Sequence, residues 1–233
     1  KESGVAMYGD KWLSRGIAVL AIDGPGQYES PVLGIYFSME AWTETGKACV
    51  DWLTARSEID PRRVAITGTS FGSLFATLAS GAEPRLAAVA VTSTCLEPGC
   101  HTIFEEASPT FKMRFMYMSG IADEAKFDQF RQSITWEGHA EKITAPYLCL
   151  AGESDELSPL AYADRMFRAM QAPRNLVVYQ DSRHSVGGVP AATLGPSPPV
   201  LLADFVADRF AGKPLVSERW YVEATGRITK TPL

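Results

Sequence analysis

The residues with the clearest chemical potential are a serine, a carboxylate and a histidine that follow one another along the chain. Residues Gly68–Gly72 read G-T-S-F-G, a G-x-S-x-G pattern centred on Ser70. An apolar run, Arg63–Thr67, precedes the pattern, and a stretch of small residues with helical character follows it. A sharp turn from strand to helix exposes a serine hydroxyl and places a helix N-terminus beside developing negative charge. The pattern predicts a nucleophilic Ser70, with the Phe71 backbone N–H as an oxyanion donor.

A serine hydroxyl is a weak nucleophile until a general base removes its proton, and the chain has three histidines to supply one. His101 follows a predicted strand, and His139 lies in a polar helical stretch. His184 lies in a loop directly after the apolar run Asn175–Tyr179, late in the chain. Its late position and its strand-end loop make His184 the predicted base.

The acid that orients the base is expected between the serine and the histidine. The apolar run Ala145–Ala151 reads as a buried strand, and it continues into a loop that contains Glu153, Asp155 and Glu156. Asp155 lies just beyond the strand end and is the predicted acid. Two alternatives stay open, namely that a neighbouring glutamate has this role or that Asp155 only caps the helix expected over 159–170. The order of the three residues along the chain favours the catalytic assignment.

With these residues in this order, the chain resembles the α/β-hydrolase superfamily over nearly its whole length. Residues Asp23–Ser30 read D-G-P-G-Q-Y-E-S, which is similar to the D-G-P-G-x-G-x-S segment of that superfamily with Tyr28 in place of the third glycine. More narrowly, D-G-P-G-Q, a Trp- and Glu-containing helix, I-D-P-R-R-V and G-T-S-F-G resemble the FrsA/DUF1100-like esterases. That group includes 2,6-dihydroxypseudooxynicotine hydrolases and fungal polyketide hydrolases. The resemblance implies cleavage of an ester or of a carbon–carbon bond in a diketone-like substrate.

Strand and helix patterns alternate along the chain, which predicts an α/β fold with a mostly parallel sheet and flanking helices. The expected strands are Gly16–Ile22, Arg63–Thr67, Leu86–Thr92, Tyr147–Ala151 and Leu176–Tyr179. The expected helices outside the central part of the chain are Met39–Arg56, Pro159–Met170 and Val200–Phe210, besides the helix that follows Ser70. Residues 190–199 are expected to form a loop. Residues 213–233 are expected to be a tail without regular structure, which packs through Trp220 and Tyr221.

Five strands are fewer than the eight of a complete hydrolase sheet. In the resembled fold the second oxyanion donor comes from a loop after the third strand, upstream of Ala18 in this numbering. We expect that loop before Lys1, with Lys1-Glu2 as its last remnant, and we interpret the chain as a fragment that lacks the N-terminal strands.

Residues 95–144 interrupt the alternation and read as two or three helices. This pattern predicts a helical lid or cap inserted into a hydrolase core that comprises 1–94 and 145–233. Part of the insertion is dense in aromatic and methionine side chains, which suit an apolar or aromatic acyl group. We interpret four of them as substrate-binding residues, against the alternative of ordinary core packing: Phe111, Met113, Phe115 and Met116.

The polar residues of this insertion have more than one interpretation. Arg114 is expected to pair with Glu105 or Glu106 on the surface rather than with a substrate carboxylate. Cleavage of a carbon–carbon bond needs a further polar group near the leaving carbon, and Glu105, Glu106 and His101 are the candidates.

The composition of the chain argues against nucleic acid and membrane as binding partners. A formal net charge of −5 and 21% charged residues give no basic footprint for nucleic acid, and no apolar run approaches the length of a membrane helix. No dinucleotide or phosphate-loop motif is present, so no cofactor is expected. The four cysteines lack a metal-binding spacing and read as free thiols, which fits a cytoplasmic protein. The expected partner is a small-molecule substrate, and a homodimer stays open.

Three functions therefore compete. The first is an esterase with a Ser-His-Asp triad, the second is a carbon–carbon bond hydrolase, and the third is a non-catalytic binding protein with a hydrolase fold. The complete set of three residues favours the first two. The sequence names neither the substrate nor the bond that is cut.

Overall fold

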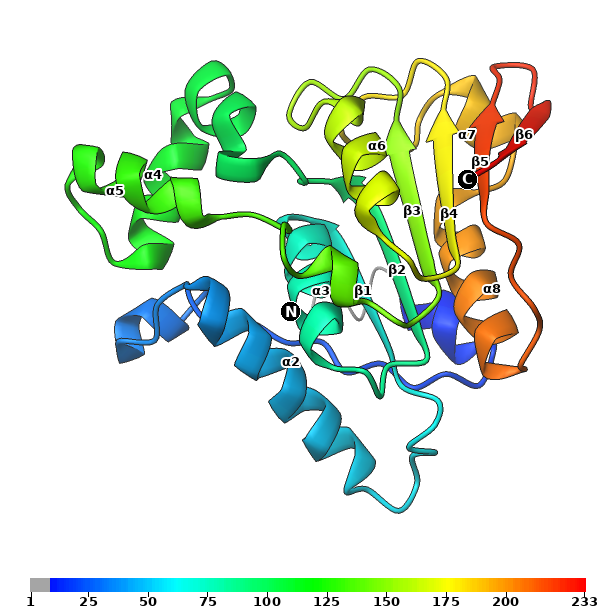
Figure 1. Cartoon of the computed structure of the whole chain (residues 1–233), viewed down its shortest axis with the longest axis horizontal. Coiled ribbons are helices and arrows are strands. Elements are labelled where there is room, and N and C mark those ends of the chain that lie inside the picture. Colours follow the sequence, from blue (N-terminus) through cyan, green and yellow to red (C-terminus); the bar gives the residue numbers. More distant parts are fainter. Residues whose placement is uncertain (1–8) are drawn as a thin grey trace.

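A six-stranded sheet with helices on both faces organises the molecule in the computed structural model, which describes residues 9–233 (Figure 1). The strands lie side by side in chain order, and β1 to β5 are parallel while β6 is antiparallel to β5. Their bounds are β1 Ala65–Ser70, β2 Ala88–Thr94, β3 Tyr147–Gly152, β4 Arg174–Tyr179, β5 Glu218–Val222 and β6 Ile228–Pro232.

The helices connect these strands in the manner of a parallel sheet. The helices outside the central insertion are η1 Ser30–Leu33, α2 Met39–Thr54, α3 Phe71–Ala82, α6 Leu160–Ala169, α7 Pro190–Leu194 and α8 Pro198–Phe210. Residues 9–13 are also helical. Between β2 and β3 lie η2 Pro98–Cys100, the π-helical turn η3 Thr102–Glu106, α4 Pro109–Ser119, α5 Glu124–Phe130, η4 Arg131–Ser133 and η5 Ala140–Lys142.

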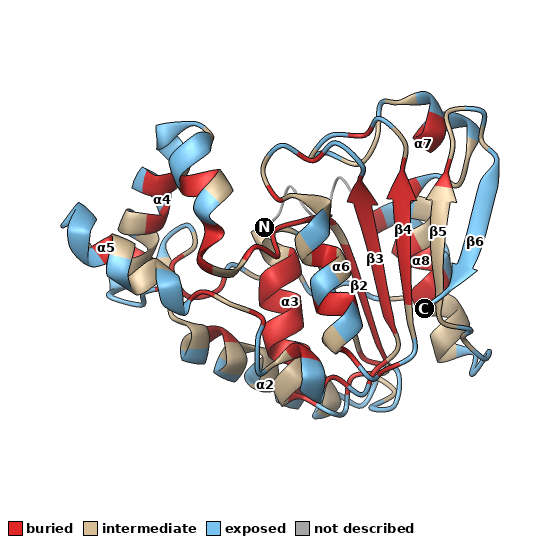
Figure 2. Ribbon diagram, turned by 45° about the horizontal axis from the view of Figure 1, so that its top comes forward, coloured by how far each residue is buried: buried red, intermediate tan, exposed pale blue. Residues whose placement is uncertain are grey.

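Successive side chains along each strand point to opposite faces of the sheet and pack into two separate apolar cores. In β2, Val89 and Val91 join a core shared with α2, α3 and α6, whereas Ala88 and Ala90 join a second core shared with α7 and α8. All six residues of β3 are buried, as expected for a strand covered by helices on both sides. Figure 2 shows this gradient, with β3 and β4 buried and β6 exposed. The two cores hold the central strands in place and so fix the positions of their carboxyl ends.

Four of the five predicted strands are present, with ends that differ by a few residues from the prediction. The prediction of a strand over Gly16–Ile22 is wrong, because residues 17–24 have no regular secondary structure and join no ladder within the described part of the chain. A strand needs a paired neighbour to satisfy its backbone, and an apolar run by itself does not supply one.

The C-terminal tail is the second correction. Residues 213–233, expected to lack regular structure, contain β5 and β6, which form a hairpin at the edge of the sheet. Trp220 and Tyr221 pack against the two opposite cores, as predicted. The residues of β6 are all exposed, so the strand carries no hydrophobic alternation by which the sequence could reveal it. The predicted loop 190–199 likewise contains α7 and the start of α8.

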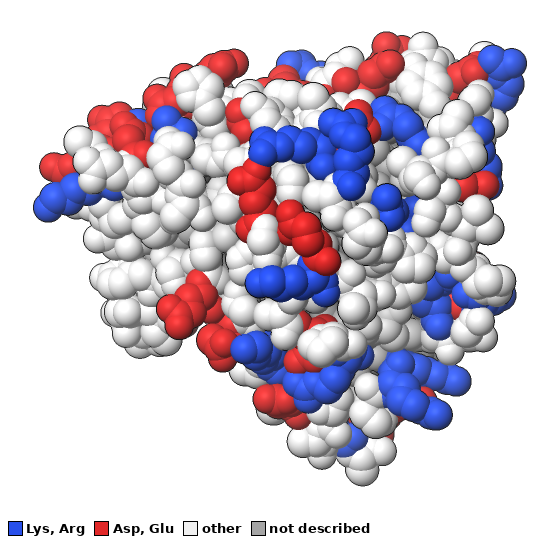
Figure 3. Space-filling view, in the orientation of Figure 1, with Lys and Arg blue, Asp and Glu red and all other residues white. Residues whose placement is uncertain are grey.

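The segment 95–144 is helical, as predicted, and α4 and α5 stand to one side of the sheet (Figure 1). None of the helices in residues 9–233 is long and apolar enough to cross a membrane. Acidic and basic side chains lie interspersed on the face of the molecule seen in Figure 3.

Candidate active site

The turn between β1 and α3 holds Ser70 in an unusual backbone conformation. β1 ends at Ser70, α3 begins at Phe71, and the register between β1 and β2 shifts between Thr69 and Ser70. Ser70 has φ of 57° and ψ of −125°, a region that L-residues rarely occupy. Such strain is maintained only where the surrounding fold enforces it, and it is typical of a nucleophile elbow.

The two glycines of the motif have different roles. A Cβ on Gly68 would lie 1.9 Å from the carbonyl oxygen of Gly72, so no larger residue fits without moving the backbone. A Cβ on Gly72 would meet no atom within 4 Å outside its own helix and neighbours. Gly68 is therefore needed for the close approach of strand and helix. At Gly72 there is space for a side-chain methyl group, so contacts do not require a glycine there.

The structure brings Ser70, Asp155 and His184 together. His184 Nε2 lies 2.9 Å from Ser70 Oγ, and His184 Nδ1 lies 3.0 and 3.1 Å from the two carboxylate oxygens of Asp155. The Asp155 side chain is 1% exposed and the His184 side chain is 12% exposed. The three residues follow β1, β3 and β4, and the carboxyl ends of parallel strands share one edge of a sheet.

Asp155 does not cap α6, the alternative interpretation of this residue, because no side-chain hydrogen bond caps the N-terminus of that helix. Its Oδ1 accepts the backbone N–H groups of Leu157 at 2.9 Å and Ser158 at 3.0 Å, which stabilises the turn before α6. The same carboxylate contacts the imidazole. Glu153 and Glu156 instead accept backbone N–H groups of Asp181 and His184, both at 3.1 Å, and neither contacts the ring.

The N-terminus of α3 offers one donor to an oxyanion beside Ser70. Phe71 is the first residue of α3 and directly follows Ser70, so its N–H has no acceptor within the helix. The helix dipole adds positive potential at the same end. The second donor was predicted before Lys1, with Lys1-Glu2 as its remnant, and these positions lie outside the described residues.

The side chain of Phe71 packs against the rings of Phe104 and Phe115 in the helical insertion, and we call these three rings the aromatic roof. The centroid of the Phe71 ring lies 3.9 Å from that of Phe115 and 5.9 Å from that of Phe104, and the latter two are 5.1 Å apart. Phe115 is 5% exposed and Phe104 is 2% exposed. Phe115 is thus one of the predicted substrate residues that lies beside the elbow, whereas the sequence prediction missed Phe104.

The other predicted substrate residues lie in different surroundings. Phe111 and Met116 are partly buried against the main core, and Met113 is 67% exposed. Met113 and Met116 line two neighbouring hollows of about 370 and 410 Å³, the first also lined by Phe104. Neither hollow is lined by Ser70 or His184, and only the first reaches the three aromatic rings, through Phe104.

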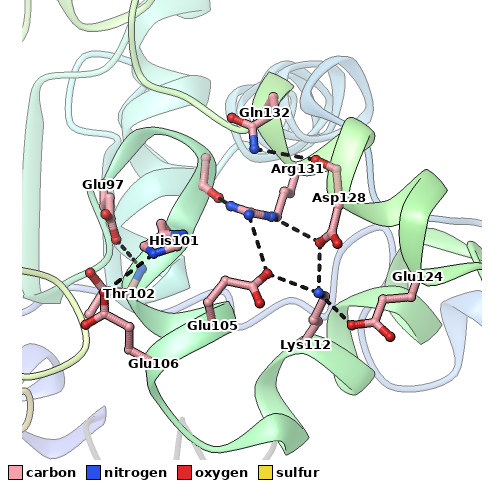
Figure 4. A network of polar contacts seen from close by, with 11 residues as sticks. Glu97, His101, Thr102, Glu105, Glu106, Lys112, Glu124, Asp128, Arg131 and Gln132 are labelled. Atoms are coloured by element: carbon pink, nitrogen blue, oxygen red, sulfur yellow. Dashed lines mark hydrogen bonds and ion pairs between the residues drawn. The ribbon is translucent and has the colours of Figure 1, made fainter.

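A buried lysine organises the charges of the insertion (Figure 4). The Lys112 Nζ lies 3.0 Å from Glu105, 2.8 Å from Glu124 and 2.8 Å from Asp128. Burial opposes the charge of Lys112, but the hydrogen bonds that its ammonium group donates to the three carboxylates outweigh this effect and raise the pKa of Lys112 above the ordinary value. Arg131 also pairs with Glu105 and Asp128, and it donates to the Gly99 carbonyl at 2.9 Å.

The expectation that Arg114 pairs with Glu105 or Glu106 is wrong. Arg114 is exposed and makes no ion pair with any described residue, because Lys112 and Arg131 occupy Glu105. Glu106 lies 3.5 Å from the exposed His101 instead. The sequence prediction overlooked Lys112 because a lysine in a helix is usually solvated.

The cysteines near this region are buried thiols. All four are free, and Cys95 and Cys100 are at most 1% exposed. The hydrogen-bonding interaction with Cys100, which favours the protonated Cys95 thiol, and burial raise the pKa of Cys95 well above its ordinary value. The protonated thiol is neither a good nucleophile nor a good metal ligand.

Two serines that sequence reasoning missed connect the elements of the site. The hydroxyl of Ser73 in α3 accepts the Cys95 N–H at 2.9 Å, and the hydroxyl of Ser158 accepts the Leu96 N–H at 3.0 Å. They join the end of β2 to the elbow helix and to the acid loop. The signal for Ser73, which is 0% exposed, was a hydroxyl residue on a mostly apolar helix directly after the G-x-S-x-G motif.

Comparison with known proteins places the chain in a family. The sequence model of the prolyl oligopeptidase family matches residues 7–193. The chain belongs to this family. Its fold is that of the α/β-hydrolases, as predicted.

Individual relatives agree with the family. The chain is 29% identical over 206 residues to the 2,6-dihydropseudooxynicotine hydrolase of Paenarthrobacter nicotinovorans, covering 84% of this chain and 51% of that protein. A crystal structure of a 2,6-dihydroxy-pseudo-oxynicotine hydrolase is similar with a TM-score of 0.81 and 26% identity, over 93% of this chain and 59% of that one. The chain therefore spans about half the length of the curated relative that it matches.

More distant structures share the fold alone. The monoacylglycerol lipase of Paleococcus ferrophilus has a TM-score of 0.59 and 15% identity, with 88% of this chain and 90% of that chain covered. This likeness supports the arrangement of sheet and helices and says nothing of the substrate.

Proposed function

We propose that this member of the prolyl oligopeptidase family is a serine hydrolase that cleaves an ester with an apolar or aromatic acyl group. The observation that carries the proposal is the unbroken line of contacts from Ser70 Oγ through the His184 ring to the Asp155 carboxylate. These atoms lie at hydrogen-bond distance in the order in which a nucleophile, a base and an orienting acid must act.

In the proposed acylation step, Ser70 Oγ attacks the substrate carbonyl carbon while His184 Nε2 takes the hydroxyl proton. The Nδ1–H group donates to Asp155, whose charge stabilises the imidazolium. The Phe71 N–H donates to the oxyanion of the tetrahedral intermediate. Collapse breaks the bond between the carbonyl carbon and the alkoxide, and His184 returns the proton to the leaving oxygen.

Deacylation reverses these roles with water. His184 Nε2 takes a proton from the water that attacks the acyl carbon, a second oxyanion forms beside Phe71, and collapse expels Ser70 Oγ, which recovers its proton from the imidazolium. The acid product is released. Water is the only co-reactant, and no step requires an oxidant or a reductant.

The aromatic roof supports the choice of an apolar or aromatic acyl group. The rings of Phe71, Phe104 and Phe115 pack against one another next to the nucleophile, and Phe104 also lines the smaller of the two hollows that Met113 and Met116 share. Methionine and aromatic side chains adapt to apolar groups of different shape. On this proposal the segment 95–144 is a lid that covers the acyl group.

The second candidate is hydrolysis of a carbon–carbon bond in a diketone-like substrate. The specific observation in its favour is the likeness to the 2,6-dihydroxy-pseudo-oxynicotine hydrolase, because sequence resemblance to that group implied such cleavage. In this reaction the leaving group is a carbanion, stabilised as an enolate and protonated by His184. Glu105, Glu106 and His101, the sequence candidates for an additional polar group, are engaged in ion pairs with other residues of the insertion.

The test is labelling of the natural full-length protein with a fluorophosphonate probe and identification of the modified peptide. The expected result is labelling at Ser70 that is lost in Ser70→Ala and strongly slowed in His184→Ala. Absence of labelling in folded wild-type protein would overturn the proposal and favour a non-catalytic binding protein.

A substrate panel then separates the two chemistries. Aryl esters of increasing acyl length, a peptide anilide and an aryl β-diketone are offered to wild type and to Ser70→Ala, and the products are identified. Release of acid and alcohol supports ester hydrolysis, whereas release of acid and ketone from the diketone supports the second candidate.

A further inference from the structure

The loop that carries His184 is held by the loop that carries Asp155 at several points besides the contact between their side chains. The Ser154 N–H donates to the Ser182 carbonyl at 2.9 Å. Gly152 packs so closely that a Cβ there would lie 2.3 and 2.4 Å from the carbonyl oxygens of Arg183 and Ser182. The two loops therefore form one unit, which we call the loop clasp, comprising residues 152–156 and 180–184.

The two glutamates beside Asp155 complete the loop clasp, each at a different point. Glu153 accepts the N–H of Asp181 at 3.1 Å, and it also accepts the hydroxyl of Tyr221 in β5 at 3.0 Å. Asp181 has φ of 56°, a left-handed conformation that costs free energy in a residue other than glycine. Glu153 thus stabilises the start of the base loop against the sheet.

Glu156 contacts the base itself through the main chain. Its Oε2 accepts the N–H of His184 at 3.1 Å, and Arg183 lies 3.4 Å from the same oxygen. The pKa of Glu156 is lowered because hydrogen bonds from backbone N–H groups, including that of His184, and the charge of Arg183 outweigh the opposing effect of burial. The carboxylate therefore stays charged as an acceptor at neutral pH.

The chain after His184 offers little other restraint. Gly187 and Gly188 follow within four residues with φ of 157° and 68°, and the next hydrogen bond is a long one, from the Val186 N–H to Ser93 Oγ at 3.4 Å. The imidazole must keep Nε2 within hydrogen-bond distance of Ser70 Oγ while Nδ1 stays within hydrogen-bond distance of the Asp155 carboxylate. A ring that is held at only one of these atoms can tilt. Three fixed points, two on the ring and one on the backbone, define its position.

We propose that Glu156 is a positioning residue that fixes the backbone of His184 and thereby aligns its ring between Ser70 and Asp155. The inference rests on the proposed serine-hydrolase function. A carboxylate that never touches the substrate then governs how fast Ser70 reacts.

The experiment compares the rate of Ser70 modification by a fluorophosphonate in wild type, Glu156→Ala, Glu156→Gln, Arg183→Ala and Glu153→Ala. Loss of a hydrogen bond to a charged acceptor corresponds to about tenfold, so Glu156→Ala is expected to react about tenfold more slowly. Glu156→Gln keeps an amide oxygen at the same place and is expected to recover to within about threefold of wild type. Arg183→Ala keeps the backbone contact and is expected to react at the wild-type rate.

Glu153→Ala is the matched control for a merely structural effect. The wild-type Glu153 side chain flanks Asp155 on the other side and anchors the loop to Tyr221. Its removal is therefore expected to lower the melting temperature while the modification rate stays within about twofold of wild type. A Glu156→Ala variant that reacts like wild type would overturn the proposal. Equal losses in Glu156→Ala and Glu156→Gln would also overturn it, because they would indicate an effect of charge rather than of the backbone contact.

A spectroscopic measurement separates this inference from the proposed function. The Nδ1–H proton between His184 and Asp155 is expected to give a downfield proton resonance in wild type and in Glu156→Gln, and to broaden or disappear in Glu156→Ala. If wild type is not labelled by the probe, the hydrolase proposal fails, and this resonance still decides whether Glu156 positions the ring. An unchanged resonance in Glu156→Ala would exclude the positioning role.

Discussion

Different kinds of contact stabilise two regions of the molecule. One is the edge of the sheet at the carboxyl ends of β1, β3 and β4, which we call the sheet edge, and the other is the helical insertion. At the sheet edge, strand ends and backbone N–H groups position Ser70, Asp155 and His184, and a single missing or added atom would disturb them. In the insertion, aromatic side chains and the charges around Lys112 hold short helices together. The difference indicates that the sheet edge is rigid and intolerant of substitution, whereas the insertion depends on side chains and on solution conditions.

The largest expected effect is at the elbow. Gly68→Ala would place a Cβ 1.9 Å from the Gly72 carbonyl, so it is expected to lose about 4 kcal/mol or more of unfolding free energy. Gly72→Ala, with open space at its Cβ, is expected to stay within about 1 kcal/mol of wild type. Urea unfolding measures both. Equal stabilities would break the view that strand and helix meet at a backbone contact specific to Gly68.

The next effect concerns the aromatic roof. Phe115→Ala removes a buried ring from above Phe71 and is expected to lose about 3 kcal/mol of unfolding free energy. Tyr117→Ala on the same helix removes a ring that is 58% exposed and is expected to lose less than about 0.5 kcal/mol. If the roof covers the acyl group, Phe115→Ala also shifts the preference among aryl esters toward bulkier acyl groups. Unchanged stability and unchanged preference would remove Phe115 from the site.

A smaller effect is expected from the charges. Lys112→Met removes the ammonium group that Glu105, Glu124 and Asp128 share and leaves Arg131 paired with two of them, which is expected to cost about 2 kcal/mol once the partial exposure of the carboxylates is allowed for. Hydrogen exchange should accelerate in α4 and α5 and remain unchanged in β3 and β4. Arg114→Met, an exposed neighbour, is the control and is expected to exchange like wild type. Faster exchange throughout the sheet would break the comparison, because the insertion would then not be a separate unit.

The smallest effect is the response to pH. The hydrogen bond and charge of Lys112 hold the pKa of Asp128 below its ordinary value of 3.8, so this contribution is present above that value and is lost as the pH falls. The pKa of Lys112 is raised above 10.5, so its contribution is lost only as the pH rises beyond that value. Limited proteolysis with an acid-active protease should therefore cut the insertion faster at pH 3 than at pH 5. Equal rates at both values would show that the ion pairs contribute nothing to its order.

The sequence predicted the sheet edge well because its residue types are dictated by local geometry. Gly68 and Ser70 belong to a motif that matches a sharp turn from strand to helix, whereas the loop after β3 offered three acids, and topology brings the strand ends together. The pairing partners of the insertion depend on helix orientation, which the sequence does not specify. The pairing with Glu105 was therefore expected for Arg114, the role of Lys112 was overlooked, and Phe104 was missed. The strand expected at Gly16–Ile22 and the unexpected β6 show the same limit, since a strand is defined by its neighbour as much as by its own residues.

The order of the strands has a consequence for the way the protein is made. Because β1 to β6 adjoin in chain order, each new strand can add to an edge that is already formed while the chain leaves the ribosome. Ser70 and its strained elbow are synthesised first, and His184 follows 114 residues later. On the proposed function, a nascent chain therefore carries the nucleophilic serine without its base until β4 has docked, so that reactivity follows the assembly of β1 to β4.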